Sequence, residues 1–165
     1  MVQTFKEVHK RSPRTFFSIT KYNHYHDELG RFASAPAGLA HATMRNGGST
    51  TNMRTGKSPK SGYMVVIDSD RGRAIDIPKG PKEKRRAAMR KEIEKYVSDN
   101  KDLLFNEKGG KYMGTWLDTE TGKLWLDVST NFTDKGEAMK AAAKQGEIAI
   151  WDVSAGDEIR IDYDS

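Results

Sequence analysis

The pattern of hydrophobic and polar positions changes near Gly62. C-terminal to it, short apolar runs alternate with turn-forming residues and with two amphipathic stretches. Met89, Ile93, Tyr96 and Val97 share one helical face, which predicts a helix over 82–98. Six runs predict strands because each is short, apolar or alternating, and bounded by Gly, Pro, Asn or Asp; they cover 63–67, 73–77, 112–118, 124–129, 148–153 and 159–163.

Turn signals suggest how these elements connect. We expect one hairpin through 68–72, between the first two strands, and another through 118–122. A second helix is predicted between Asp134 and Gly146, since Asp134 and Glu137 are spaced as in a capping box and glycine often ends a helix. The resulting order, β-β-α-β-β-α-β-β, predicts an α+β fold with a mostly antiparallel sheet and two helices on one face.

The first 62 residues have a different composition. Residues 33–62 are rich in Ser, Thr, Gly, Asn, Pro and Ala, and we expect them to be flexible because they offer little apolar surface to bury. Residues 15–20 have strand-like composition, which fits either a strand of the main sheet or a segment that adds to a partner's sheet. The sequence therefore predicts an extended basic arm and linker over 1–62 and a small α+β domain over 63–165.

Charge separates the same two segments. The chain carries 28 Lys+Arg and 23 Asp+Glu, a net charge of +5. Residues 1–62 contain ten basic and three acidic residues, or +7, whereas 63–165 contain 18 and 20, or −2. This asymmetry is typical of a basic arm that meets an acidic partner. We expect neither a membrane-spanning helix nor a secretory signal, because no apolar run approaches the required length.

Several side chains are candidates for chemistry. The absence of cysteine excludes disulfides, thiolate zinc sites and a cysteine nucleophile. The cluster His24-Tyr-His-Asp27 is more typical of a recognition or turn element than of a metal site, because no spaced second pair of ligands accompanies it. The basic run 84–90 could contact phosphates, but acidic residues at 83, 92 and 94 are interspersed with it, so we expect a solvated helix face. We therefore expect no metal and no cofactor.

Catalysis is not favoured by the residue pattern. All four histidines lie in the arm, at positions 9, 24, 26 and 41, and no nucleophile stands beside a partner base. Most acids fall at turns and strand ends, where Asp127 and Asp152 are expected to accept hydrogen bonds from turn amides. We expect a protein that is not an enzyme.

Two stretches resemble known phage proteins. Lys21-Tyr-Asn-His-Tyr-His-Asp-Glu-Leu-Gly-Arg-Phe-Ala-Ser34 resembles a linker in tailed-phage and prophage proteins encoded near the portal and capsid genes, such as Mu-type head morphogenesis proteins. The sequence from Tyr112 to Ser129, with Gly-Thr-Trp and Leu-Asp-Val-Ser, is similar to a small domain of unassigned activity that recurs in phage and mobile-element proteins; the similarity continues through Glu137-Ala and Glu147–Val153.

The resemblance implies a bacteriophage virion protein, a minor head-associated or capsid-binding component located in the virion and, during assembly, in the host cytoplasm. Its partners would be capsid or portal proteins within a symmetric assembly, with packaged DNA as a further candidate and no membrane. Alternatives are a phage-delivered effector or inhibitor that binds a host protein, and a nucleic-acid-binding or nuclease-like protein. The expected partner-binding residues are Phe16, Phe17, Tyr22, His24, His26, Gly30, Arg31 and Phe32, and the expected nucleic-acid contacts are Lys10, Arg11 and Arg14.

Overall fold

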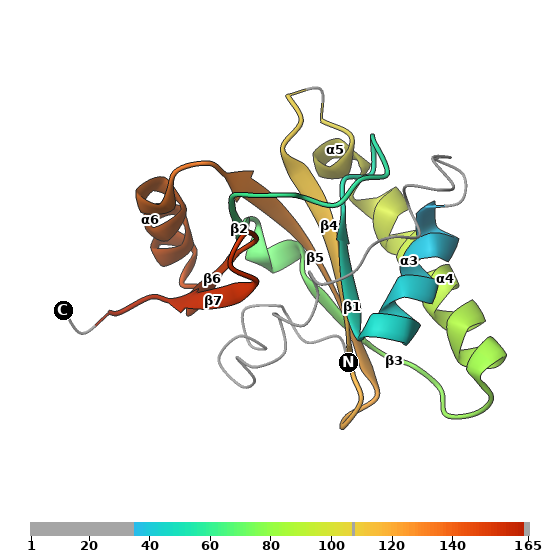
Figure 1. Ribbon diagram of the computed structural model, residues 1–165. Coiled ribbons are helices and arrows are strands. Elements are labelled where there is room, and N and C mark those ends of the chain that lie inside the picture. Colours follow the sequence, from blue (N-terminus) through green and yellow to red (C-terminus); the bar gives the residue numbers. More distant parts are fainter. Residues whose placement is uncertain (1–34, 107, 164–165) are drawn as a thin grey trace.

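The structure is a computed structural model that describes residues 35–106 and 108–163. In this part of the chain, helices lie beside one sheet of seven strands, which pair antiparallel (Figure 1). The predicted α+β fold with a mostly antiparallel sheet is confirmed. The helices are α3 (Ala35–Asn46), α4 (Lys82–Asp99), α5 (Lys101–Leu104) and α6 (Lys135–Gln145), with a 3-10 turn η3 (Ser69–Arg71). The strands are β1 (Gly48–Thr51), β2 (Tyr63–Val66), β3 (Arg73–Asp76), β4 (Lys111–Asp118), β5 (Lys123–Phe132), β6 (Ala149–Asp152) and β7 (Asp157–Arg160).

Strand β5 organises the sheet. One of its edges pairs with β4 through the predicted hairpin, in which Trp116 lies opposite Trp125. Its other edge pairs with β3 near its start and with β2 near its end. The order across the sheet is β1-β4-β5-β2-β6-β7, and β3 lies beside β5.

The predicted hairpin between β2 and β3 is wrong. Both strands run antiparallel to β5, so they follow one another in the same direction along a single edge. The turn residues between them form η3 instead of a reversal, with Asp68 in the left-handed region at φ 56°. Turn-forming residues therefore separate two strands that pair with the same edge of β5. The other edge of β2 pairs with β6.

The helices α4 and α6 cover the same face of the sheet, as predicted. Leu126 of β5 and Ile93 of α4 belong to one buried cluster. Alternate residues of a strand face the same side of the sheet, so Leu126 and Thr130 of β5 share one face. Thr130 lies opposite Val65 of β2, which therefore faces the same side. Val65 in turn belongs to a second cluster with Ala138 of α6. A single sheet face therefore carries both clusters, and the two helices pack at separate places along it.

Residues 35–51, which were predicted to be a flexible spacer, form α3 and β1 of the folded unit. Leu39 and Ala40 are completely buried in the cluster that contains α4. The Thr43 and Thr115 hydroxyl oxygens lie 2.6 Å apart and join α3 to β4, beside which β1 pairs. Small side chains let α3 pack closely against α4 and β4, so the helix makes a large contact although its residues are small. The pattern of hydrophobic residues does not predict this helix, because the segment has few large apolar side chains.

The C-terminal elements follow the predicted signals. The Asp134 carboxylate accepts a hydrogen bond from the Glu137 amide at 2.8 Å, and Gly146 ends α6 at φ 74°. The last strand lies earlier than expected, at Asp157–Arg160 instead of 159–163. Asp152 accepts hydrogen bonds from two turn amides, as predicted. Within the described residues, no helix has the length and apolar character needed to cross a membrane.

Candidate binding surfaces

The residues predicted to bind partners lie outside the described part of the chain. These are Phe16, Phe17, Tyr22, His24, His26, Gly30, Arg31 and Phe32, together with the predicted nucleic-acid contacts Lys10, Arg11 and Arg14. The possible strand over 15–20 lies outside it as well. These residues remain predictions, and the surfaces that the structure does describe come from other parts of the sequence.

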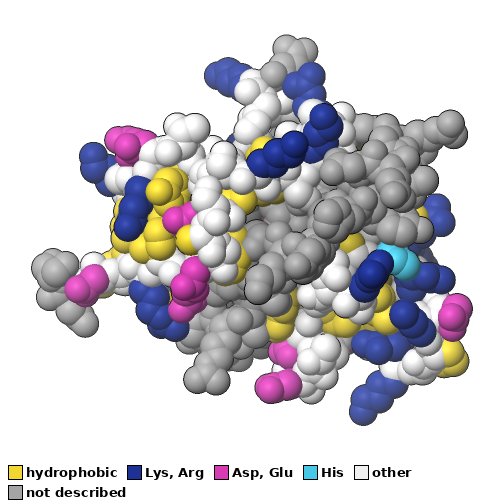
Figure 2. All heavy atoms as spheres, viewed as in Figure 1, with side chains coloured by type: hydrophobic (Ala, Val, Ile, Leu, Met, Phe, Trp, Pro, Cys, Tyr) yellow, Lys and Arg dark blue, Asp and Glu magenta, His cyan; other side chains and the backbone are white. Residues whose placement is uncertain are grey.

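The first such surface is built by two neighbouring helices. His41 and Arg45 are four residues apart on α3, and Lys82 and Arg86 are four residues apart on α4, so each pair occupies one helical face. The two faces meet where Arg86 Nη1 lies 3.4 Å from His41 Nδ1. Together with Arg85, these residues are termed the α3–α4 cationic surface. Figure 2 shows Lys and Arg side chains gathered around the cyan histidine on this side of the molecule.

The pKa of His41 reflects the positive charge of its neighbours. Burial lowers the pKa of His41, and Arg86, Arg45 and Lys82 lower it further because each opposes a second positive charge on the ring. The surface therefore favours a neutral His41 and gathers positive potential that an anion would relieve.

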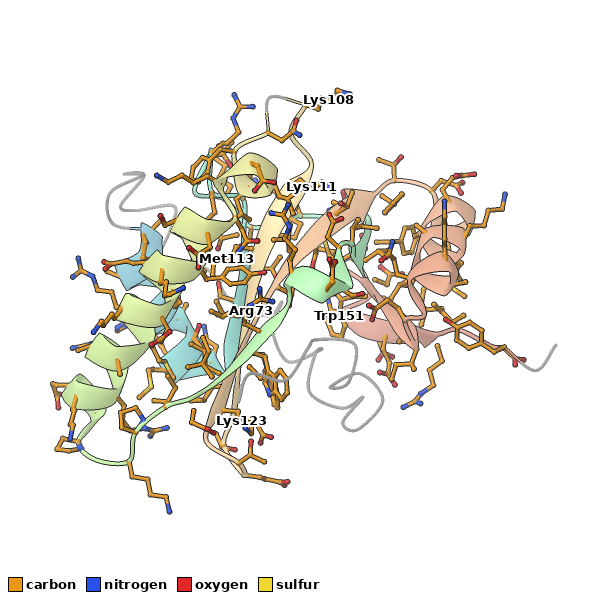
Figure 3. All side chains as sticks on the ribbon, turned by 180° about the vertical axis from the view of Figure 1, so that it is seen from behind. Arg73, Lys108, Lys111, Met113, Lys123 and Trp151 are labelled. Atoms are coloured by element: carbon orange, nitrogen blue, oxygen red, sulfur yellow. The ribbon has the colours of Figure 1, made fainter. Side chains whose placement is uncertain are left out.

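A second candidate is an open pocket of about 620 Å³ between β3 with η3 and the C-terminal half of α4. In Figure 3, Arg73 lies between η3 and α4. Most of the charges in the pocket are already paired. Arg71 makes two 2.8 Å hydrogen bonds to Asp102, and Lys95 lies 2.7 Å from Asp99. The nine lining residues, none of which is Ser, Thr, Cys or His, are Arg71, Arg73, Ile75, Glu92, Lys95, Tyr96, Asp99, Asn100 and Asp102.

The Tyr96 side chain lines this pocket from α4. It is buried, and its hydroxyl has no hydrogen-bond partner among the described residues. Burial raises the pKa of the Tyr96 hydroxyl far above its ordinary value, and Asp127 adds to the shift. The hydroxyl therefore stays protonated. The paired charges that line the pocket join η3 to α5.

The third candidate is a buried carboxyl group on the other face of the sheet. Asp127 is 2% exposed and accepts a 2.8 Å hydrogen bond from the Ser129 hydroxyl. It lies opposite Gly114 in the β4–β5 register, and a Cβ atom at position 114 would come 2.5 Å from the Asp127 carboxylate. The Gly-Thr-Trp and Leu-Asp-Val-Ser strings thus meet in space, because the glycine leaves the room that the carboxyl group occupies.

Desolvation raises the pKa of Asp127 to about 7, and the Ser129 hydrogen bond only partly opposes this shift. The expectation that Asp127 bonds turn amides is wrong, since it lies in mid-strand and uses a neighbouring hydroxyl. A carboxyl group with a perturbed pKa is often functional. Here its fit against Gly114 indicates a structural role in holding the hairpin.

The described residues contain no group of three or more His, Asp or Glu side chains arranged to hold a metal ion. A comparison of the chain with protein-family models, with curated proteins and with solved structures finds no match.

Sequence patterns alone found only half of the α3–α4 cationic surface. The basic run on α4 is visible in the sequence, which favours a solvated face for it. His41 and Arg45 escape prediction because their segment has the composition of a spacer. The one available signal was the four-residue interval between them, which matches the interval between Lys82 and Arg86.

Proposed function

We propose that the chain is a non-enzymatic bacteriophage virion component, associated with the head, that acts by binding other virion proteins. The proposal starts from the phage-like strings in the sequence. What supports it structurally is the place of Ala35, which directly follows Ser34, the last residue of the phage-like linker string, and lies in α3 (Ala35–Asn46).

This connection has a mechanical consequence. Ala35 is 2% exposed and belongs to the same cluster as Leu39 and Ile93, so the residue that follows the string is fixed in the core. No long spacer separates the phage-like string from the folded unit. A virion protein that binds Arg31 and Phe32 would therefore hold the sheet and helices within a few residues of the contact. That arrangement suits a component with a defined place in a particle.

The second phage-like string supports the same proposal. Its residues form the β4–β5 hairpin, where Gly114 accommodates Asp127 and Trp116 lies opposite Trp125. These residues build the centre of the sheet, so a protein that shares this string would share the scaffold. Because the string serves the fold, it agrees with a protein that acts by binding.

The decisive experiment is quantitative mass spectrometry of purified particles from the phage or induced prophage that encodes the chain. A copy number that matches a symmetry of the head, portal or tail supports the proposal, and absence of the chain from intact particles overturns it.

A variant then tests the expected anchors. We expect Arg31→Ala with Phe32→Ala to abolish incorporation, while circular dichroism of the purified variant stays unchanged, because arginine and aromatic side chains dominate many interfaces. The matched control is Arg160→Ala with Tyr163→Ala, an arginine and an exposed aromatic near the other end of the described chain. Normal incorporation of the first variant would refute the role of these anchors.

A further inference from the structure

We propose that the α3–α4 cationic surface binds the phosphate backbone of nucleic acid without sequence preference. The inference concerns residues outside the phage-like strings, and it does not depend on the virion assignment. It assigns a phosphate contact to the folded unit, where the sequence favours a solvated face for the basic run of α4.

The first argument is the local excess of charge. Residues 79–86 contain five basic residues and one acid, Glu83. The C-terminal half of α4 differs, because there Arg90 pairs with Glu94 and Lys95 pairs with Asp99. Helix α4 is thus cationic at one end only, and that end is also its N-terminus, where the backbone dipole adds positive potential. The neighbouring helix α3 brings Arg45 and His41 to the same place.

The second argument is that these cations have no carboxylate partner in the described part of the chain. Among residues 35–106 and 108–163, no Asp or Glu forms an ion pair with Arg45, Lys82 or Arg86. Like charges held this close repel one another, so the surface gains most from a ligand that carries several negative charges. A ligand with a single carboxylate would neutralise only one of them.

The third argument is geometric and favours phosphate. Cations four residues apart on a helix are separated by about 6 Å along its axis, so the two helices present paired rows of donors. Duplex DNA carries about one charge per 1.7 Å of its axis, which brings several phosphates within reach of both rows. Arginine forks suit phosphate oxygens, and Arg45, Arg85 and Arg86 supply three of them.

The test is fluorescence anisotropy with the full chain and a labelled 20-base-pair duplex of arbitrary sequence, across a salt series. The test variant is Arg45→Ala with Lys82→Ala and Arg86→Ala. The matched control is Lys135→Ala with Lys140→Ala and Lys144→Ala, which removes the same charge from exposed positions on α6. We expect the test variant to lose tenfold or more in affinity, and its slope of log affinity against log salt to become shallower by about 2.7. The control should keep both values close to the parent's.

Equal losses in both triple variants would overturn the proposal, because binding would then follow net charge. Undetectable binding by the parent chain at low salt would overturn it as well. Polyglutamate of matched charge is the second probe. If it binds as tightly as the duplex and loses the same affinity in the test variant, the surface fits an acidic protein and the nucleic-acid assignment is wrong.

A site-specific readout comes from His41, whose ring signals can be followed by NMR through a pH titration. The duplex should raise the pKa of His41, since phosphates offset the cations that lower it. Signals from histidines 9, 24 and 26 provide internal references in the same spectra. A His41 titration that the duplex leaves unchanged, despite binding, would place the contact elsewhere and refute the proposal.

Discussion

Replacing Asp127 by Asn should change how the stability of the protein depends on pH. Burial raises the pKa of Asp127 to about 7 in the folded state, whereas an exposed aspartate titrates near 3.8. Between these two values the folded chain keeps a proton that the unfolded chain releases. Asparagine is neutral at every pH and can still accept the hydrogen bond from Ser129, so it imitates the protonated acid without titrating.

The sign and size of the effect follow from this difference in proton binding. Below about pH 4 the carboxyl group is protonated in both states, and its contribution to stability is fully present. As pH rises toward 7 the unfolded state is favoured by about 1.4 kcal/mol per pH unit, which amounts to about 4 kcal/mol over the whole interval. Above pH 7 the effect levels off. Other groups titrate in both proteins, so the difference between parent and variant isolates position 127.

The assay is urea denaturation of the parent chain and Asp127→Asn from pH 5 to 8, followed by fluorescence of the three tryptophans. Relative to the parent, we expect the free energy of unfolding of Asp127→Asn to rise by about 2.3 kcal/mol between pH 5 and pH 7 and by about 0.4 kcal/mol more above pH 7. Ser129→Ala, which removes the hydroxyl and leaves the carboxyl group, should retain the pH dependence. A stability difference between parent and Asp127→Asn that is independent of pH would show that Asp127 does not bind a proton on folding.

Three further changes test other parts of the structure. Gly114→Ala should destabilise the protein by about 1–3 kcal/mol in urea denaturation, because the new methyl group meets the Asp127 carboxylate, and adding Asp127→Ala should recover part of the loss; additive losses would contradict the contact. Asp134→Ala should cost about 1 kcal/mol in thermal unfolding, with Asp134→Asn close to the parent, since either side chain can accept the Glu137 amide. Leu39→Ala should cost about 2–5 kcal/mol if α3 belongs to the core, whereas a flexible linker would tolerate it.

Periodicity predicted the elements whose apolar residues repeat regularly. Leu124, Leu126 and Val128 alternate along β5, and Met89 and Ile93 follow the helical interval on α4, so both elements were found close to their true bounds. Asp127 shows the limit of this approach. Alternation places it on the face opposite Leu126, but whether that face is exposed depends on long-range packing, which a strand's own sequence does not record.

The α3–α4 cationic surface shows a second limit. Its two halves lie about 40 residues apart in the chain, and they come together only because α3 packs against α4. Helix α3 itself was missed because Ala, Gly and Thr supply its contacts, and these residues resemble linker composition. The β2–β3 hairpin failed for a related reason, since turn residues specify a change of direction without specifying which strand comes next.

The small side chains of α3 and β1 have a consequence for synthesis of the chain. Gly48 of β1 pairs with Trp116 of β4, and Tyr63 of β2 pairs with Phe132 of β5, so both early strands must wait for the β4–β5 hairpin to be made. Pairings over such long separations form slowly, and exposed apolar segments aggregate while they wait. A helix built on alanine and a strand of glycine, serine and threonine offer little to a neighbouring nascent chain. The composition that makes these elements resemble a linker also keeps them soluble until their partners leave the ribosome.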